Sequence, residues 1–209
     1  MPRAKTEPRK RPRQARSRVL YDALIEASKR VLASEGVAAV TTAKVAELAG
    51  VSIGSLYQYF PSREALIAAV IDHKLEASVA ELTPMLVGLR EAGLDEAIRG
   101  LVEIAVRFYR DETPLYREMV AAMAAVDRDA HVRRVLEGFD QAIVAVLEPH
   151  RGQLCEGFER CAWIMRETLI GCVREAAARQ PETLADGSLA TRLELMCRAL
   201  LGAPAGEPG

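Results

Sequence analysis

Aromatic residues are scarce in this chain: they make up 5% of its 209 residues, although half of all residues are hydrophobic. Strict alternation of polar and β-branched residues, which would indicate strands, is also missing. Ala, Leu, Glu and Arg recur instead, and because they have high helix propensity we expect an all-α fold. The length suits one sizeable core or two units, a small module packed on a larger one, but not three units.

Long apolar runs are absent as well. No stretch of the sequence reaches the roughly 18 consecutive apolar residues that a membrane span needs. The basic start of the chain is not followed by an apolar signal segment. We therefore expect a cytoplasmic protein with no membrane partner.

The cysteines and histidines lack the spacing of metal sites. The four cysteines contain no CxxC pair, and the three histidines form no HxxxH or HxxE pattern. Paired acids, a glycine-rich phosphate loop and a nucleophile elbow are missing too. We therefore expect no metal, no cofactor and no enzymatic activity. Reduced, partly buried thiols are the default for the cysteines, and a redox sensor that uses Cys155 or Cys161 stays open as an alternative.

Positive charge is concentrated at the start of the chain. Residues 1–18 carry eight Lys or Arg side chains and one acid, so this segment sums to +7 and the rest of the chain to −8, which gives the net charge of −1. A basic end on an acidic protein is typical of a segment that meets a polyanion. A solvated tail has the same composition and stays open as the alternative. Three prolines prevent a stable helix, so residues 1–13 are expected to be a disordered basic arm.

Three helices are predicted in the first third of the chain. Apolar residues recur at helical spacing over residues 14–35, and Gly36 can end this helix in the left-handed conformation. Two short helices follow, one over residues 41–49 and, after a turn at Gly50, one that Ser52 can cap. Helices this short must pack steeply on their neighbours, which is the geometry of a helix-turn-helix.

The remaining pattern is helical throughout. A longer helix starts at Ser62 and is predicted to end at Pro84, the boundary between the two halves. The helix at 156–179 is apolar on more than one face, so it is either central in a bundle or shared with a partner chain. The helices predicted beyond Pro84 cover residues 94–110, 115–126, 129–148, 156–179 and 188–201.

One segment is specific enough to indicate a family. Residues 41–66 read TTAKVAELAGVSIGSLYQYFPSREAL. In a helix-turn-helix register that opens at Thr42, Ala46 falls at the helix crossing, Gly50 at the turn and Leu56 in the small core. The crossing admits little beyond a methyl group, and the turn favours a positive φ. The segment resembles the N-terminal DNA-binding domain of the tetracycline-repressor (TetR) family, over about residues 16–75.

This resemblance implies a function and an organisation. Members of the family have a three-helix helix-turn-helix head, joined by a fourth helix to a larger helical domain that binds ligands and dimerises. We therefore expect a homodimeric repressor of transcription that binds a palindromic double-stranded DNA operator and is released by a small-molecule effector. We expect four parts. They are a disordered basic arm (residues 1–13), a DNA-binding domain with its connecting helix (14–81), a ligand-binding and dimerisation domain (84–202) and a disordered tail (203–209).

The predicted DNA contacts lie at the start of the second helix, along the third helix and at the start of the fourth. The first residues of a recognition helix face base edges, and Gln58 can make a paired hydrogen bond to adenine. Tyr57 and Tyr59 cannot share one face of a short helix. The resemblance assigns both to the DNA backbone, while on the sequence alone at least one packs against a neighbouring helix. Lys44 can bind a phosphate at the start of its helix, and the resemblance assigns Arg63 to a phosphate as well. For both residues the alternative is a side chain that is simply solvated. The predicted contacts are Thr42, Lys44, Ser52, Ile53, Gly54, Ser55, Tyr57, Gln58, Tyr59 and Arg63, and Phe60 is assigned to the core.

The second half contains the candidate effector contacts. A pocket lined by aromatic and methionine side chains suits a small, largely apolar molecule. A plain hydrophobic core is the alternative for each of these side chains. The candidates are Phe108, Tyr109, Met119, Met123, Phe139 and Trp163.

Two other function classes fit the sequence less well. An enzyme would need convergent polar groups in the second half, which the sequence does not display. An architectural DNA-binding protein would need positive charge spread along the chain, yet residues 81–209 hold 15 basic and 21 acidic side chains.

Overall fold

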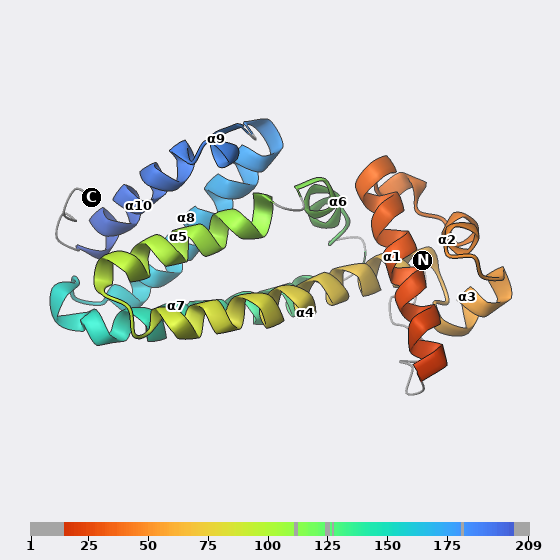
Figure 1. Ribbon diagram of the computed structural model, residues 1–209, viewed down its shortest axis with the longest axis horizontal. Helices are drawn as coiled ribbons and strands as arrows, with labels where there is room; N and C mark the ends of the chain where they lie inside the picture. The colour runs from red at the N-terminus through yellow and green to blue at the C-terminus, as the bar shows by residue number, and fades with distance from the viewer. Residues whose placement is uncertain (1–14, 111–112, 124–125, 127, 181, 203–209) are drawn as a thin grey trace. The chain divides into compact units, whose positions relative to one another are not determined.

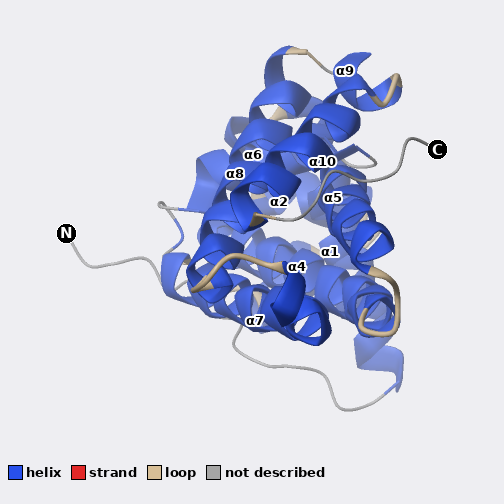
Figure 2. Ribbon diagram, turned by 90° about the vertical axis from the view of Figure 1, so that its left-hand side faces the viewer, coloured by secondary structure: helices blue, strands red, loops and turns tan. Residues whose placement is uncertain are grey.

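The computed structural model describes residues 15–110, 113–123, 126, 128–180 and 182–202. Figure 2 shows helices and loops but no strand in this part of the chain, which confirms the predicted all-α class. The basic arm and the tail, predicted at residues 1–13 and 203–209, lie outside the described residues. The helices are α1 (Ala15–Glu35), η1 (Val37–Ala39), α2 (Thr42–Leu48), α3 (Ile53–Tyr59), α4 (Arg63–Leu89), α5 (Leu94–Arg110), α6 (Thr113–Met123), α7 (Asp129–Leu147), η3 (Glu148–Gln153), α8 (Phe158–Arg179), α9 (Glu182–Ala185) and α10 (Ser188–Leu201).

Contacts between residues divide the chain into two compact units. The first unit contains residues 1–77 and 114–133, and the second contains residues 78–113 and 134–209. α6 and the start of α7 therefore belong with α1, α2 and α3, the three helices of the head (Figure 1).

Local signals set the helix ends of the head. The side chains of Thr41 and Ser52 cap α2 and α3, each accepting a hydrogen bond from the amide three residues ahead, at 3.2 and 3.1 Å. Gly50 makes the turn between these helices with a φ of +67°. Gly36 ends α1 with φ +82° and ψ 171°, so glycine is required there, but the backbone is not in the left-handed helical conformation that we expected.

The predicted small core of the head is present. Ala46 at the helix crossing is 3% exposed, and Leu56 and Phe60 are fully buried. The ring of Tyr21 on α1 packs against Phe60, with centroids 5.1 Å apart. These apolar contacts hold the two short helices, which could not persist alone.

The prediction that Pro84 ends the fourth helix is wrong, because α4 continues through Pro84 to Leu89. Proline has no amide hydrogen and so leaves the carbonyl of Ala80 without its helical donor. Both residues lie on the exposed side of α4, where water can bind the freed carbonyl. Next to Pro84, Thr83 donates its hydroxyl to the Val79 carbonyl at 2.7 Å.

The other helices match their predicted ranges closely. α5 and α10 span the predicted residues, while α6 begins two residues early and ends at Met123. α9 is a short helix inside a segment that we predicted to be a break between helices. None of the described helices is long and apolar enough to cross a membrane.

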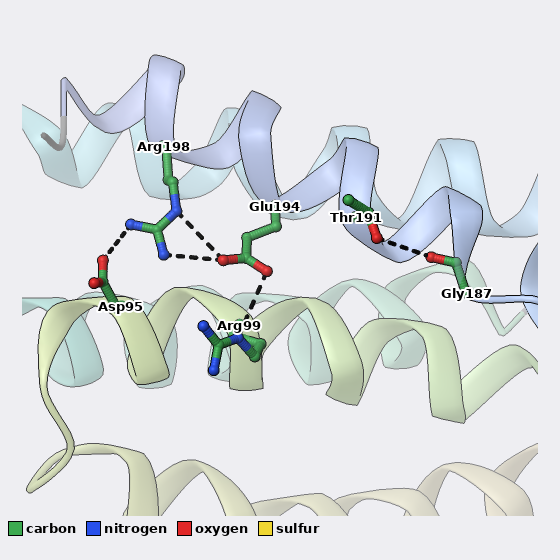
Figure 3. A network of polar contacts seen from close by, with 6 residues as sticks. All are labelled: Asp95, Arg99, Gly187, Thr191, Glu194 and Arg198. Carbon is green, nitrogen blue, oxygen red and sulfur yellow. Dashed lines mark hydrogen bonds and ion pairs between the residues drawn. The ribbon is translucent and has the colours of Figure 1, made fainter. Parts of the chain in front are cut away.

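α5, α8 and α10 pack against one another in the second unit (Figure 1). α8 is central there: it buries Phe158, Met165 and Val173 but leaves Trp163 and Ile164 exposed. An ion-pair network fastens α10 to α5 (Figure 3). In this network Arg198, whose side chain is 9% exposed, binds Asp95 and Glu194, and Glu194 also pairs with Arg99 at 3.7 Å.

Candidate DNA-binding surface and ligand-binding half

The start of α3 presents an exposed surface. Ser52, Ile53, Gly54 and Gln58 are exposed, and the exposed fraction of Ile53 is 44%. A Cβ added at Gly54 would contact only the Ser52 hydroxyl, at 3.9 Å. No neighbour within the described chain therefore requires glycine at this position, and its predicted role, to let DNA approach the helix closely, stays a prediction.

The hydroxyls at the start of α3 bind each other. The Oγ atoms of Ser52 and Ser55 lie 2.8 Å apart, and Ser52 also accepts the Ser55 amide. Ser55 is half-buried. Each hydroxyl keeps further hydrogen-bonding capacity that can reach a phosphate or a base edge.

The two tyrosines of α3 have different surroundings. Tyr57 is 43% exposed, and its hydroxyl lies 3.1 Å from Oγ1 of Thr42, which joins the start of α2 to α3. Tyr59 is 9% exposed and packs edge-on against Tyr21 at 6.1 Å between ring centroids. Little of the Tyr59 surface is left for a DNA contact, so Tyr57 is the better placed of the two.

The two basic candidates already have partners within the protein. Lys44 makes an ion pair with Glu35 across the end of α1, and both side chains are partly exposed. Arg63 donates to the carbonyl oxygen of Val37, the first residue of η1, in the segment that connects α1 to α2. Lys44 can still face a phosphate, whereas the guanidinium of Arg63 holds the segment that positions α2. The role of either residue in DNA binding stays a prediction.

Glu118 supports the head, although sequence reasoning did not point to it. This residue lies on α6, and its carboxylate accepts the amide hydrogen of Val37 at 3.0 Å. The same carboxylate lies against Gly36, where an added Cβ would be 3.1 Å from Oε2. The partners are 81 positions apart in the sequence, so no local pattern could have revealed the contact. Glu118 and Arg63 together bind both polar groups of the Val37 backbone.

The predicted effector contacts are distributed over both units. Met119 is buried and Met123 half-buried in the unit that contains the head. Phe139 is half-buried in the second unit, and Trp163 is 54% exposed there. The side chains of Phe108 and Tyr109 lie outside the described part of the structure. For all six residues, a role in ligand binding stays a prediction.

One buried polar group in the second unit lacks a partner. The side chain of Arg166 on α8 is 8% exposed and binds Asp140 on α7, while its Nη1 atom is buried without a hydrogen-bond partner in the described structure. Burial lowers the pKa of Arg166, but the contacts with Asp140 and Glu167 outweigh this effect and raise it. The guanidinium therefore stays charged. No group of three or more His, Cys, Asp and Glu residues that could hold a metal ion occurs among the described residues.

Comparisons with known proteins agree with this geometry. Residues 24–70 match the family described as bacterial regulatory proteins of the tetR family, and residues 93–201 match the tetracyclin repressor-like C-terminal domain. The HTH-type transcriptional regulator BetI of Rhizobium meliloti (strain 1021) is 28% identical over 133 residues, which cover 60% of this chain and 61% of that protein. The match thus spans less than two thirds of that relative.

Solved structures show the same fold. A putative TetR-family transcriptional regulator from Mesorhizobium loti MAFF303099 superposes with a TM-score of 0.68 at 20% identity, covering 90% of this chain and 98% of that one. The fatty acid degradation regulator FadR from Bacillus halodurans gives 0.62 at 20% identity, covering 87% and 98%. With a helix-turn-helix head and a C-terminal domain that both match, this chain belongs to the TetR family and is a DNA-binding transcriptional regulator, not an enzyme.

Proposed function

We propose that this regulator is a homodimeric repressor that binds a palindromic operator and is released by a small, largely apolar effector. The observation that carries the DNA-binding part is the exposed start of α3, where Ile53, Gly54 and Gln58 form a surface that no other part of the described chain covers. In a helix-turn-helix protein this surface enters the major groove. Gln58 reads a base there, while Thr42, Tyr57 and Lys44 bind the DNA backbone.

Exposed apolar side chains on α8 and α10 support a dimer. Trp163 and Ile164 on α8 are 54% and 41% exposed, and Leu195 on α10 is 65% exposed. A two-fold dimer through these helices would bury them, and it would present two recognition helices to a palindrome. In this arrangement Trp163 lies at the dimer interface, which competes with its predicted role as an effector contact.

Sedimentation velocity tests the dimer. Trp163→Arg should shift the protein at micromolar concentration from dimer toward monomer, because it places a charge in the proposed interface. Val19→Arg is a matched control, since Val19 is an exposed apolar residue of α1 in the head, and it should leave the dimer intact. A wild-type protein that sediments only as a monomer would remove the dimer from the proposal.

Glu118 offers a route by which an effector acts on the head. Met119, a candidate effector contact, follows Glu118 directly on α6, and Glu118 binds the backbone between α1 and α2. An effector that displaces α6 would therefore disturb the support of the helix-turn-helix.

Titration with and without operator tests the effector. Candidate molecules are found by thermal shift, and their affinity is then measured for the free protein and for the operator complex. If the effector weakens operator binding tenfold, the operator must weaken effector binding by the same factor, about 1.4 kcal/mol. Equal effector affinity in both titrations would leave a DNA-binding protein without the proposed release mechanism.

A further inference from the structure

Two free thiols lie close together where the loop after η3 enters α8. The Sγ atoms of Cys155 and Cys161 are 3.6 Å apart, and both residues are half-buried. A disulfide bond is about 2.05 Å long, so a displacement of about 1.5 Å would join these sulfurs.

The surrounding structure holds the pair in place. The amide of Cys155 donates to the carbonyl of Leu201 at the end of α10, at 2.9 Å, and its thiol lies 3.8 Å from the Leu200 carbonyl. A Cβ added at Gly202 would lie 3.1 Å from the Cβ of Cys155, so α10 ends directly against this residue. Cys161 is fixed separately, in the first turns of α8. Two different elements therefore bring the sulfurs together.

The other two cysteines have different surroundings. Cys197 is fully buried, and burial raises the pKa of its thiol to about 12, which makes it unreactive at neutral pH. Cys172 is half-buried on α8. Burial also raises the pKa of the Cys161 thiol, so oxidation of the pair should be faster at alkaline pH.

We propose that Cys155 and Cys161 form a redox-active dithiol that a hydroperoxide converts into an intrachain disulfide. In the first step one thiolate attacks the peroxide, so that the O–O bond breaks and an S–O bond forms; the hydroxide that departs takes up the proton this thiol released and leaves as water. In the second step the sulfur of the other cysteine attacks the sulfenic sulfur. The S–S bond forms, the S–O bond breaks, and the hydroxide that leaves combines with the proton of the attacking thiol to give a second water. Two thiols are oxidised by two electrons and one hydrogen peroxide is reduced. The 3.6 Å separation favours the second step over further oxidation by another peroxide.

Peptide mapping of the full-length protein tests this proposal. The reduced protein is treated with a small excess of hydrogen peroxide, the remaining thiols are alkylated, and the product is digested with trypsin. Arg160 lies between the two cysteines, so cleavage after it separates them. The disulfide should then appear as two cross-linked peptides that a thiol reductant releases. Cys172 and Cys197 should not take part in the cross-link. Each should be recovered either as the alkylated thiol or, where the reagent has no access, as the unmodified thiol.

Variants exclude other sources of the cross-link. Cys172→Ser should form the cross-link at the wild-type rate, whereas Cys155→Ser and Cys161→Ser should both abolish it. Three results would overturn the proposal: both thiols staying fully reduced, both advancing separately to sulfinic or sulfonic acids, or the bond forming between two chains on a non-reducing gel.

Discussion

Removal of the Glu118 carboxylate should release the backbone at the entrance to the helix-turn-helix. In the structure this carboxylate accepts the Val37 amide at 3.0 Å, and its side chain is 19% exposed. A hydrogen bond to a charged group contributes about 1.5–3 kcal/mol, and partial exposure places this one near the lower end. We therefore expect Glu118→Ala to cost about 1.5 kcal/mol at this site. Glu118→Gln keeps a neutral acceptor and should cost less, about 0.5–1 kcal/mol.

Amide hydrogen exchange measures this effect where it occurs. Because the chain forms two compact units, global unfolding need not be a two-state process, and a local readout is preferable. A loss of about 1.5 kcal/mol corresponds to roughly tenfold faster exchange of the Val37 amide. Residues in α10, which belongs to the other unit, should exchange unchanged.

The neighbouring residue provides a matched control. Arg117 lies on the same helix, is 63% exposed and contacts Glu118 at 3.4 Å. Arg117→Ala should change the exchange of the Val37 amide less than about twofold, because exposed ion pairs contribute little. Equal exchange at Val37 in wild type, Glu118→Ala and Glu118→Gln would refute the assignment of Glu118 as a support of the head.

Three further predictions concern the arm, the tyrosines and the buried thiol. Deletion of residues 1–13 should flatten the dependence of DNA affinity on salt by close to one unit of slope for each phosphate that the arm neutralises, and an unchanged slope would mean that the arm is a passive tail. Tyr57→Phe should weaken binding to all DNA sequences about equally in a fluorescence-anisotropy titration, and by more than Tyr59→Phe, because Tyr59 is buried; the reverse order would contradict the assignment. Burial in the folded protein raises the pKa of Cys197 from 9.0 to about 12. Between these two pH values the thiol is ionised in the unfolded chain but still protonated in the folded protein. The free energy of unfolding therefore falls as pH rises, by at most about 1.4 kcal/mol per pH unit. Cys197→Ala should remove this part of the slope in denaturant titrations, and an identical slope in both proteins would show that the thiol does not contribute.

Local chemistry makes much of the head predictable. The caps at Thr41 and Ser52, the positive φ of Gly50 and the burial of Leu56 all depend on residues within a few positions of one another. The sequence pattern alone therefore indicates the helix-turn-helix.

Features that depend on distant parts of the chain were not predictable. Pro84 was expected to end a helix, but the exposed side of α4 tolerates it, and exposure is a tertiary property. The contact between Glu118 and Val37 and the packing of Tyr59 on Tyr21 likewise join separate elements. The proximity of Cys155 to Cys161 depends on the end of α10, which sequence spacing alone does not reveal.

Selection of bound duplexes from a random DNA library tests the central claim most directly. The full-length protein should enrich palindromic sites with two equivalent half-sites, and Gln58→Ala should relax the preference at one base pair in each half-site by roughly 1–3 kcal/mol, with the rest of the site unchanged. Retention of all library sequences without enrichment, or an identical preference with Gln58→Ala, would contradict the account that α3 reads the operator through this residue.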